Sequence, residues 1–315
     1  MNAVLIIDKP AGLTSHDVVN RVRRIVKERS VGHLGTLDPL ATGVLPLVIG
    51  SFTRLAQFYT ASEKSYEGVI RFGFSTDTYD AEGEPTSPVQ SVNFSLDAIR
   101  ELGSHFRGKI EQIPPPFSAK KVQGVPAYKL ARKHKEISLA AVQVEIKDFE
   151  ILSIEGDRAT FRARVASGTY MRSVAHDMGQ CLGCGAHLQS LRRTAVAEFS
   201  CTDARTLEEL ALAAQAGSED GLFVHPRKIL PDFPSVTATD EMAARIRTGR
   251  TVNLPELSKA KFVKVFYSQR ELIAIAARVA GTLFHPKIVL APGVPQVKSG
   301  LSEVAARGSR RGKNE

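Results

Sequence analysis

A glycine-rich stretch at residues 32–43, GHLGTLDPLATG, carries a single acidic side chain, Asp38. Glycines allow a backbone to come close to a ligand, and polar groups on a loop between apolar segments are typical of functional sites. A lone carboxylate in such a loop can act as a nucleophile or stabilise developing positive charge. Three further polar side chains share the stretch: His33, Thr36 and Thr42.

Asp38 is followed directly by Pro39, and this pair has a second interpretation. Aspartate is favoured at the N-cap of a helix, and proline is favoured at the first helical position. On that interpretation Asp38 caps a short helix and has no chemical role. The residues alone leave both interpretations open.

The other acidic residues offer Asp38 no clear partner. Asp77 and Asp80 lie in a polar turn, where aspartate commonly bonds local backbone, and Asp177 lies on an expected helix near Arg172. A paired-carboxylate hydrolase and a Ser-His-Asp hydrolase are both poorly supported, because no second acid is well placed and no GxSxG motif is present. Arg172 is a candidate partner that would hold Asp38 ionised and oriented. Alternatively, Arg172 bonds backbone or a phosphate.

Cysteine usage indicates no metal centre. The chain has three cysteines, and Cys181 and Cys184 form a CxxC pair without a second pair at zinc spacing. We therefore expect ordinary thiols and no metal. With no signal peptide and no apolar run long enough to span a bilayer, we also expect a reducing cytosol.

The composition is that of a basic globular protein. The 315 residues are 43% hydrophobic, and the formal net charge is +9 with a pI of about 9.5. This length accommodates one large core plus a small extra domain. A basic surplus favours a polyanionic partner such as nucleic acid, although charge alone is equally compatible with a merely basic protein.

Hydrophobic periodicity predicts the elements that must position these residues. A strand at 3–7 is expected to lead to a helix capped by Thr14 or Ser15. Further strands are expected at 44–49, 64–72, 142–154, 159–165 and 187–196, and helices at 51–59, 96–106 and 173–182.

A strongly basic segment follows the prolines at 114–116. We expect residues 114–140 to be an insertion that grips nucleic acid, or alternatively a solvated loop and helix. Tyr128 lies among seven basic side chains: Lys120, Lys121, Lys129, Arg132, Lys133, His134 and Lys135.

The composition changes again around residue 232. Residues 233–295 are expected to form a small β-rich domain, and residues 296–315 a disordered basic tail with weak phosphate affinity. The expected elements of the small domain are a helix at 240–247 and strands at 261–267, 272–279 and 283–290.

The motifs, in this order, resemble those of the bacterial TruB-type tRNA pseudouridine synthases. The resemblance covers about the first two-thirds of the chain. It is carried by DKPAGLTS at 8–15, GHLGTLDPLATGVLPL at 32–47, KSY at 64–66, TDTYDAEG at 76–83, SGTYMR at 167–172 and LRRT at 191–194. Leu34 and Thr36 stand where some relatives carry Thr and Ala, which we expect to be tolerated. Residues 233–295 are more weakly similar to the PUA RNA-binding domain.

The resemblance implies an α+β catalytic domain over residues 1–232, with a mixed, mostly antiparallel sheet flanked by helices, followed by a PUA-like domain. It implies an isomerase that flips uridine-55 out of the tRNA T-loop and converts it to pseudouridine, without a cofactor or a metal. The implied partner is the T-arm of tRNA. No obligate protein partner is implied, and a cytoplasmic monomer is expected.

The same resemblance assigns roles to individual residues. Asp38 corresponds to the catalytic aspartate, which attacks C1′ of the flipped uridine or assists formation of a glycal. Tyr66 corresponds to the tyrosine that packs on the base and takes a proton, and Arg172 corresponds to the arginine that pairs with the aspartate. The remaining implied pocket residues are Tyr170, Leu191, His33, which helps to extrude the base, and Lys9.

Two alternatives remain open at this point. Guide-RNA-dependent relatives of the dyskerin type share these motifs, and an RNA chaperone would use the same surfaces without catalysis. Activity of the purified chain on a bare T-arm hairpin distinguishes these possibilities.

Overall fold

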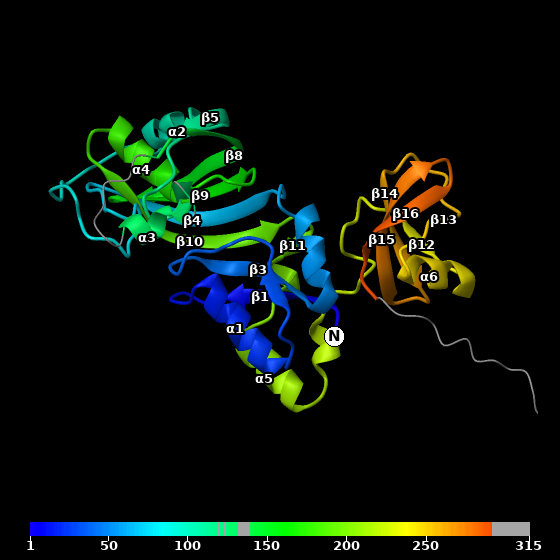
Figure 1. Cartoon of the computed structure of the whole chain (residues 1–315). Coiled ribbons are helices and arrows are strands. Elements are labelled where there is room, and N and C mark those ends of the chain that lie inside the picture. The colour runs from blue at the N-terminus through cyan, green and yellow to red at the C-terminus, as the bar shows by residue number, and fades with distance from the viewer. Residues whose placement is uncertain (119, 123, 132–138, 292–315) are drawn as a thin grey trace, which may run out of the picture. The chain divides into compact units, whose positions relative to one another are not determined.

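The computed structural model describes residues 1–118, 120–122, 124–131 and 139–291. The chain divides into two compact units, Met1–Asp232 and Phe233–Glu315 (Figure 1).

The first unit is built on one nine-stranded sheet. Its strands are β1 (Ala3–Lys9), β2 (Val31–His33), β3 (Thr42–Ile49), β4 (Lys64–Phe72), β5 (Gly108–Gln112), β8 (Val142–Glu155), β9 (Arg158–Val165), β10 (Ala186–Val196) and β11 (Phe199–Ser200). The main path runs β1–β3–β10–β4–β9–β8–β5, while β2 pairs with β3 and β11 with β10. Only the short β3–β10 pair is parallel among these. The predicted fold class is therefore confirmed.

Helices flank this sheet. They are α1 (Ser15–Ile25), α2 (Leu96–Ser104), α4 (Met171–Cys181) and α5 (Leu207–Gln215), with short 3₁₀ helices η1 (Gly50–Phe58), η2 (Cys201–Asp203) and η3 (Glu219–Leu222). The helix expected at 51–59 is thus a 3₁₀ helix. Thr14 caps α1: its hydroxyl accepts from the Asp17 N–H at 3.1 Å, and the Asp17 carboxylate accepts from the Thr14 N–H at 2.9 Å. This reciprocal box confirms the predicted start of the helix.

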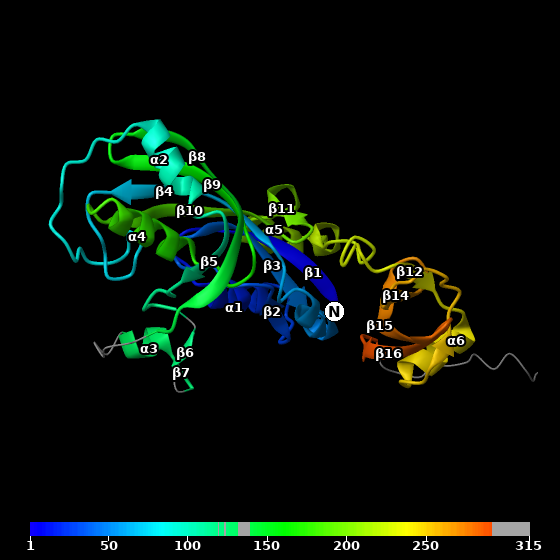
Figure 2. The ribbon, with the colours of Figure 1, turned by 90° about the horizontal axis from the view of Figure 1, so that it is seen from above.

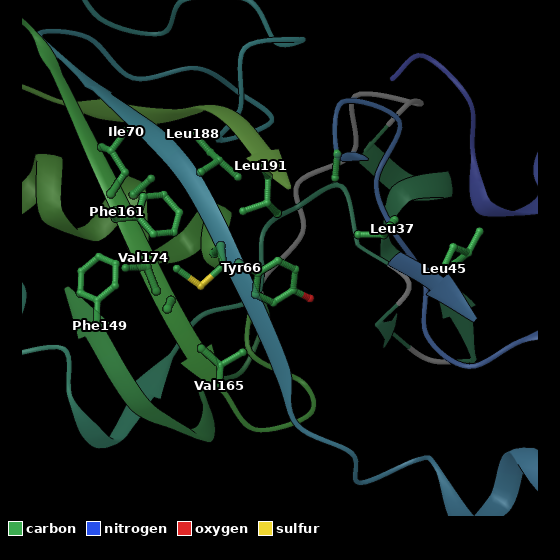
Figure 3. Packing of buried hydrophobic residues seen from close by; sticks show 14 of the residues in the cluster. Leu37, Leu45, Tyr66, Ile70, Phe149, Phe161, Val165, Val174, Leu188 and Leu191 are labelled. Atoms are coloured by element: carbon green, nitrogen blue, oxygen red, sulfur yellow. The ribbon is translucent and has the colours of Figure 1, made fainter. Parts of the chain in front are cut away.

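The core of the first unit lies between the sheet and the helices. Figure 3 shows Val174 of α4 packed with Phe161, Phe149 and Ile70, and the rings of Phe149 and Phe161 lie 5.5 Å apart. Tyr66 lies at the end of this cluster, and its hydroxyl points away from it, toward the side of Leu37 (Figure 3). Burial of the apolar face of α4 therefore fixes the helix that carries Arg172 at its first turn.

Gly43 allows β10 to come close to β3. Its φ is +97°, and a Cβ at this position would lie 2.2 Å from the carbonyl oxygen of Arg193. A side chain cannot be accommodated there, because real contacts are never so short. The glycine thus permits the β3–β10 junction that brings Arg193 beside the Asp38 loop.

The basic segment forms small elements of its own: β6 (Lys121–Val122), β7 (Val125–Pro126) and α3 (Ala127–Ala131). Figure 2 shows them projecting from the sheet near β5. Lys120 and Lys129 are exposed. Four of the basic residues of this segment lie outside the described residues: Arg132, Lys133, His134 and Lys135.

Within residues 233–291, the described part of the second unit, the chain forms a five-stranded sheet with one helix. Its elements are β12 (Ser235–Thr237), α6 (Asp240–Arg247), β13 (Val252–Asn253), β14 (Phe262–Tyr267), β15 (Glu271–Ala280) and β16 (Leu283–Val289). The strand order is β12–β14–β15–β16–β13 around a core that includes Val263, Ile273 and Phe284. The β-rich character is confirmed, the PUA assignment stays a prediction, and the predicted tail at 296–315 lies outside the described residues.

Asp177 on α4 makes stability depend on pH. Burial raises the pKa of its carboxyl from 3.8 to about 6. Between these values the folded protein binds more protons than the unfolded chain, so stability is lost as pH rises through about 6. We expect Asp177→Asn to raise the free energy of unfolding at pH 7.5 by about 1 kcal/mol, because solvent screens a half-buried charge, and by less at pH 4.5. Urea denaturation at both pH values measures this, and a variant no more stable than wild type at pH 7.5 contradicts it.

Candidate active site

Asp38 lies on a turn between β2 and β3. The Ala41 N–H donates to the Asp38 carbonyl at 3.1 Å, which closes a turn over residues 38–41, and no helix begins there. The alternative in which Asp38 caps a helix is therefore wrong. Because no local N–H group occupies it as a cap, the carboxylate is available to a partner distant in sequence, and 38% of the side chain is exposed.

Side chains distant in sequence hold the Asp38 loop on the N-terminal side of the carboxylate. Ser15 accepts from the Leu37 N–H at 2.7 Å and donates to the Leu37 carbonyl at 3.0 Å. The fully buried Arg193 donates to the carbonyls of Gly35 and Thr36, at 3.0 and 3.1 Å. These bonds satisfy three backbone carbonyls of the loop and fix the backbone from which Asp38 projects.

Arg172 pairs with Asp38. Its Nε lies 2.9 Å from Asp38 Oδ2, and only 6% of the arginine side chain is exposed. Its two terminal nitrogens donate to the carbonyls of Thr78 and Phe117, at 3.0 and 2.9 Å. Each guanidinium nitrogen therefore has its own partner, which fixes the orientation of the ion pair.

Asp80 adds a second carboxylate to this arginine. It is buried, and its Oδ2 lies 3.7 Å from Arg172 Nη1. Its Oδ1 accepts from the Thr78 hydroxyl at 2.6 Å and from the Glu82 N–H at 3.1 Å. Burial, followed by the charges of Asp80 and Asp38, raises the pKa of the Glu82 carboxyl. The site thus gathers several acidic groups around one buried guanidinium.

Tyr66 lies on β4 and is nearly buried, with its hydroxyl against the Arg193 guanidinium. Burial raises the pKa of the phenol above its ordinary value. Tyr66 is therefore a neutral phenol at physiological pH. A neutral phenol donates a hydrogen bond and offers a stacking face, and it is a poor base.

Tyr170 lies near the ion pair, and Leu191 lies in the core cluster that contains Tyr66. Tyr170 is the N-cap residue of α4, directly before Met171. Burial raises the pKa of its phenol, and the Asp38 charge raises it further. Leu191 packs in the same core cluster as Tyr66. Leu191 also lines a cavity of about 450 Å³, together with Leu40 and Thr42. Tyr170 therefore lies within electrostatic reach of Asp38, while Leu191 provides apolar surface in the cluster that contains Tyr66.

Lys9 and His33 form hydrogen bonds with backbone groups of the site. Lys9 is fully buried, and its Nζ donates to the carbonyls of Leu13 and Pro39, at 2.6 and 3.1 Å. Burial lowers the pKa of this ammonium group to about 8. His33 accepts from the Gly35 N–H at 3.3 Å, and burial, followed by the Arg193 charge, lowers its pKa. His33 is thus a neutral imidazole at the start of the Asp38 loop.

The structure therefore brings Asp38 into contact with Arg172 and places Tyr66, Tyr170 and Lys9 within electrostatic reach of that carboxylate. Sequence reasoning assigned no role to three site residues: Ser15 beyond a helix cap, Arg193, and Asp80. For Arg193, the alternation of side chains along the expected strand at 187–196 could have indicated a buried position. Strand alternation places it on the same face as Leu191, with Arg192 facing the other way.

The described residues contain no group of three His, Cys, Asp or Glu side chains that could hold a metal ion. Within the same part of the chain, no helix combines the length and apolar character needed to cross a membrane.

Comparison with known proteins decides the family. Residues 23–171 match the model of the TruB family pseudouridylate synthase N-terminal domain. Residues 172–230 match the tRNA pseudouridylate synthase B C-terminal domain. A tRNA pseudouridine synthase B of Solibacter usitatus is 51% identical over 92% of this chain and 100% of that protein. The chain belongs to the TruB family. The resemblance drawn from the motifs is thereby confirmed.

Other TruB relatives and solved structures are similar over the same span. A tRNA pseudouridine synthase B of Aquifex aeolicus is 38% identical over 92% of this chain and 100% of that protein. The chain in a crystal structure of a Cbf5–Nop10–Gar1 complex matches with a TM-score of 0.67 and 25% identity, over 92% of this chain and 85% of that one. A chain of an archaeal box H/ACA Nop10–Cbf5 complex matches with a TM-score of 0.65 and 27% identity, over 92% and 86%.

Proposed function

We propose that this chain is a tRNA pseudouridine synthase that isomerises uridine-55 in the T-loop. The observation that carries the proposal is the ion pair of Asp38 with the buried Arg172, at 2.9 Å, in a member of the TruB family. Bacterial relatives named tRNA pseudouridine synthase B, up to 51% identical, support tRNA as the substrate. A tRNA substrate favours a cytoplasmic location.

The reaction suits a lone, oriented carboxylate. Flipping the target uridine out of the loop costs on the order of a few kcal/mol, which stacking on aromatic side chains offsets. Tyr66 and Tyr170 are the aromatic groups near Asp38. Asp38 then attacks C1′ as the C1′–N1 bond breaks, or assists the formation of a glycal. The freed uracil turns, and C5 bonds to C1′ as the bond between C1′ and Asp38 breaks or as the glycal is consumed. The proton on C5 passes to water, and N1 takes up a proton from water. Reactant and product are isomers, so the step consumes no oxidant or reductant.

The basic surfaces supply the grip on RNA in this proposal. Lys120 and Lys129 are exposed in the segment that projects near β5. Contacts from such lysines to phosphates strengthen binding without reading sequence, and they weaken as salt rises. The β-rich second unit is proposed to act as a PUA-like RNA-binding domain.

The purified chain alone, incubated with a synthetic T-arm hairpin, tests the proposal. We expect pseudouridine at the position of uridine-55, detected by chemical mapping, with a monomer in size-exclusion chromatography. A matched hairpin with cytidine at that position serves as the control. Product only after addition of a guide RNA and partner proteins would favour a Cbf5-like enzyme. RNA remodelling without any product would favour a chaperone, and either result would overturn the proposal.

A further inference from the structure

Gln112 joins the end of β5 to the start of α4. It is 1% exposed, and its side-chain amide pairs with both backbone groups of Tyr170. Gln112 Nε2 donates to the Tyr170 carbonyl at 3.1 Å, and Gln112 Oε1 accepts from the Tyr170 N–H at 2.8 Å. A carboxamide carries both a donor and an acceptor, which this pairing requires. Gln112 thus holds a residue 58 positions away in the chain.

Tyr170 is the residue from which α4 begins, and none of its own side-chain bonds caps the helix. Fixing its backbone therefore fixes the direction of the first helical turn, which contains Arg172. Two neighbouring bonds join the same segments. The Ser173 hydroxyl donates to the Ile113 carbonyl at 2.7 Å, and Arg172 Nη2 donates to the Phe117 carbonyl at 2.9 Å.

We propose that Gln112 is a positioning residue for the isomerisation, an inference that rests on the proposed function. The amide holds the Tyr170 backbone so that the Tyr170 ring and the Arg172 guanidinium face Asp38. Gln112 acts through Tyr170 and Arg172 rather than by touching the uridine. Small displacements of such groups have large effects on rate, since a misplacement of about 1 Å can cost about 100-fold.

If Gln112 positions the site, its substitution changes the reaction rate, whereas substitution of a residue that only stabilises the fold changes the Tm alone. Ser173 provides a matched control, because its hydroxyl bonds the adjacent carbonyl of Ile113 and leaves the pairing with Tyr170 intact. Both Gln112→Met and Ser173→Ala remove buried hydrogen bonds and are expected to lower the Tm. Only Gln112→Met is expected to displace the start of α4 relative to Asp38.

The test is a single-turnover assay on the T-arm hairpin at saturating enzyme. We expect Gln112→Met to lower the rate about 100-fold with less than about a threefold change in the Kd for the hairpin. Ser173→Ala should react within about threefold of the wild-type rate, although its Tm is expected to fall about as much as that of Gln112→Met. A Gln112→Met variant that is folded by circular dichroism and reacts at the wild-type rate would overturn the inference, as would equal rate losses in the two variants.

Gln112→Glu keeps the test decisive if Gln112→Met does not fold. Its carboxylate accepts from the Tyr170 N–H but cannot donate to the Tyr170 carbonyl, whereas the protonated acid can do both. Burial raises the pKa of a carboxyl group, so lowering the pH should restore the pairing within the assay range. We expect the rate of this variant, relative to wild type at the same pH, to rise as pH falls; a ratio of one at every pH would overturn the inference. A wild-type chain without product would overturn both this inference and the proposed function, while an active wild type with unaffected variants would overturn this inference alone.

Discussion

The Asp38→Asn variant is expected to form no detectable pseudouridine while it still binds the T-arm hairpin. An amide has the shape of the carboxylate but neither its charge nor its nucleophilicity, so attack on C1′ is lost. Removal of a nucleophile costs about 10⁴-fold or more in other enzymes, and we expect a loss on that scale. The side chain is only 38% exposed and contacts Arg172 rather than the basic segment, so the Kd for RNA should change little.

Single-turnover chemical mapping of the hairpin measures the rate, and filter binding measures the Kd. Asp77→Asn is the matched control, because Asp77 is an exposed acid on the 76–83 turn that accepts from the Glu84 N–H at 2.9 Å, a bond that an amide oxygen can keep. This control should react at the wild-type rate. Turnover by Asp38→Asn at the wild-type rate would refute the assignment of Asp38 as the reactive group.

Much of the first unit could be predicted from local pattern. Alternation in 64–72 and 159–165 corresponds to β4 and β9, and the Thr14 cap sets the start of α1. These features depend on neighbours in sequence, which a sequence displays directly. The order of the strands in the sheet cannot be predicted from neighbours in sequence. It includes the parallel β3–β10 junction, which depends on the close approach of Gly43 to Arg193.

The candidate site likewise contains some residues that local motifs indicate and others that only long-range contacts reveal. Asp38 and Arg172 were singled out because each lies in a distinctive motif. Asp80 was assigned to an ordinary turn, and it does bond that turn, yet the fold also places it 3.7 Å from Arg172. Gln112 is an ordinary polar residue at a strand end until the chain closes on Tyr170. Pairing between common residue types that are distant in sequence produces no local sequence pattern, so these roles arise only in the folded structure.

Arg172→Lys is expected to lower the single-turnover rate by about 10² to 10³-fold. Lysine keeps the positive charge but lacks the planar fork, so one ammonium group cannot reach Asp38 and the carbonyls of Thr78 and Phe117 together. The carboxylate of Asp38 then loses its fixed orientation toward C1′, which is the contribution we assign to the arginine. A wild-type rate for Arg172→Lys on the hairpin would refute that contribution.

The Arg172→Met variant is expected to lower the stability of the folded chain. It removes the positive charge beside the buried Asp80 and leaves two carbonyls without their donor. Breaking a buried pair in this way costs about 3–5 kcal/mol in the free energy of unfolding. Arg71→Met is the matched control, since the Arg71–Asp157 pair, at 2.8 Å, is about one-third exposed and should cost less than about 1 kcal/mol. Urea denaturation compares the two variants, and equal losses would mean that burial of Arg172 does not set its effect. A larger loss for Arg172→Met would show that the guanidinium paired with Asp38 also neutralises the buried Asp80. Catalysis and folding would then require the same side chain.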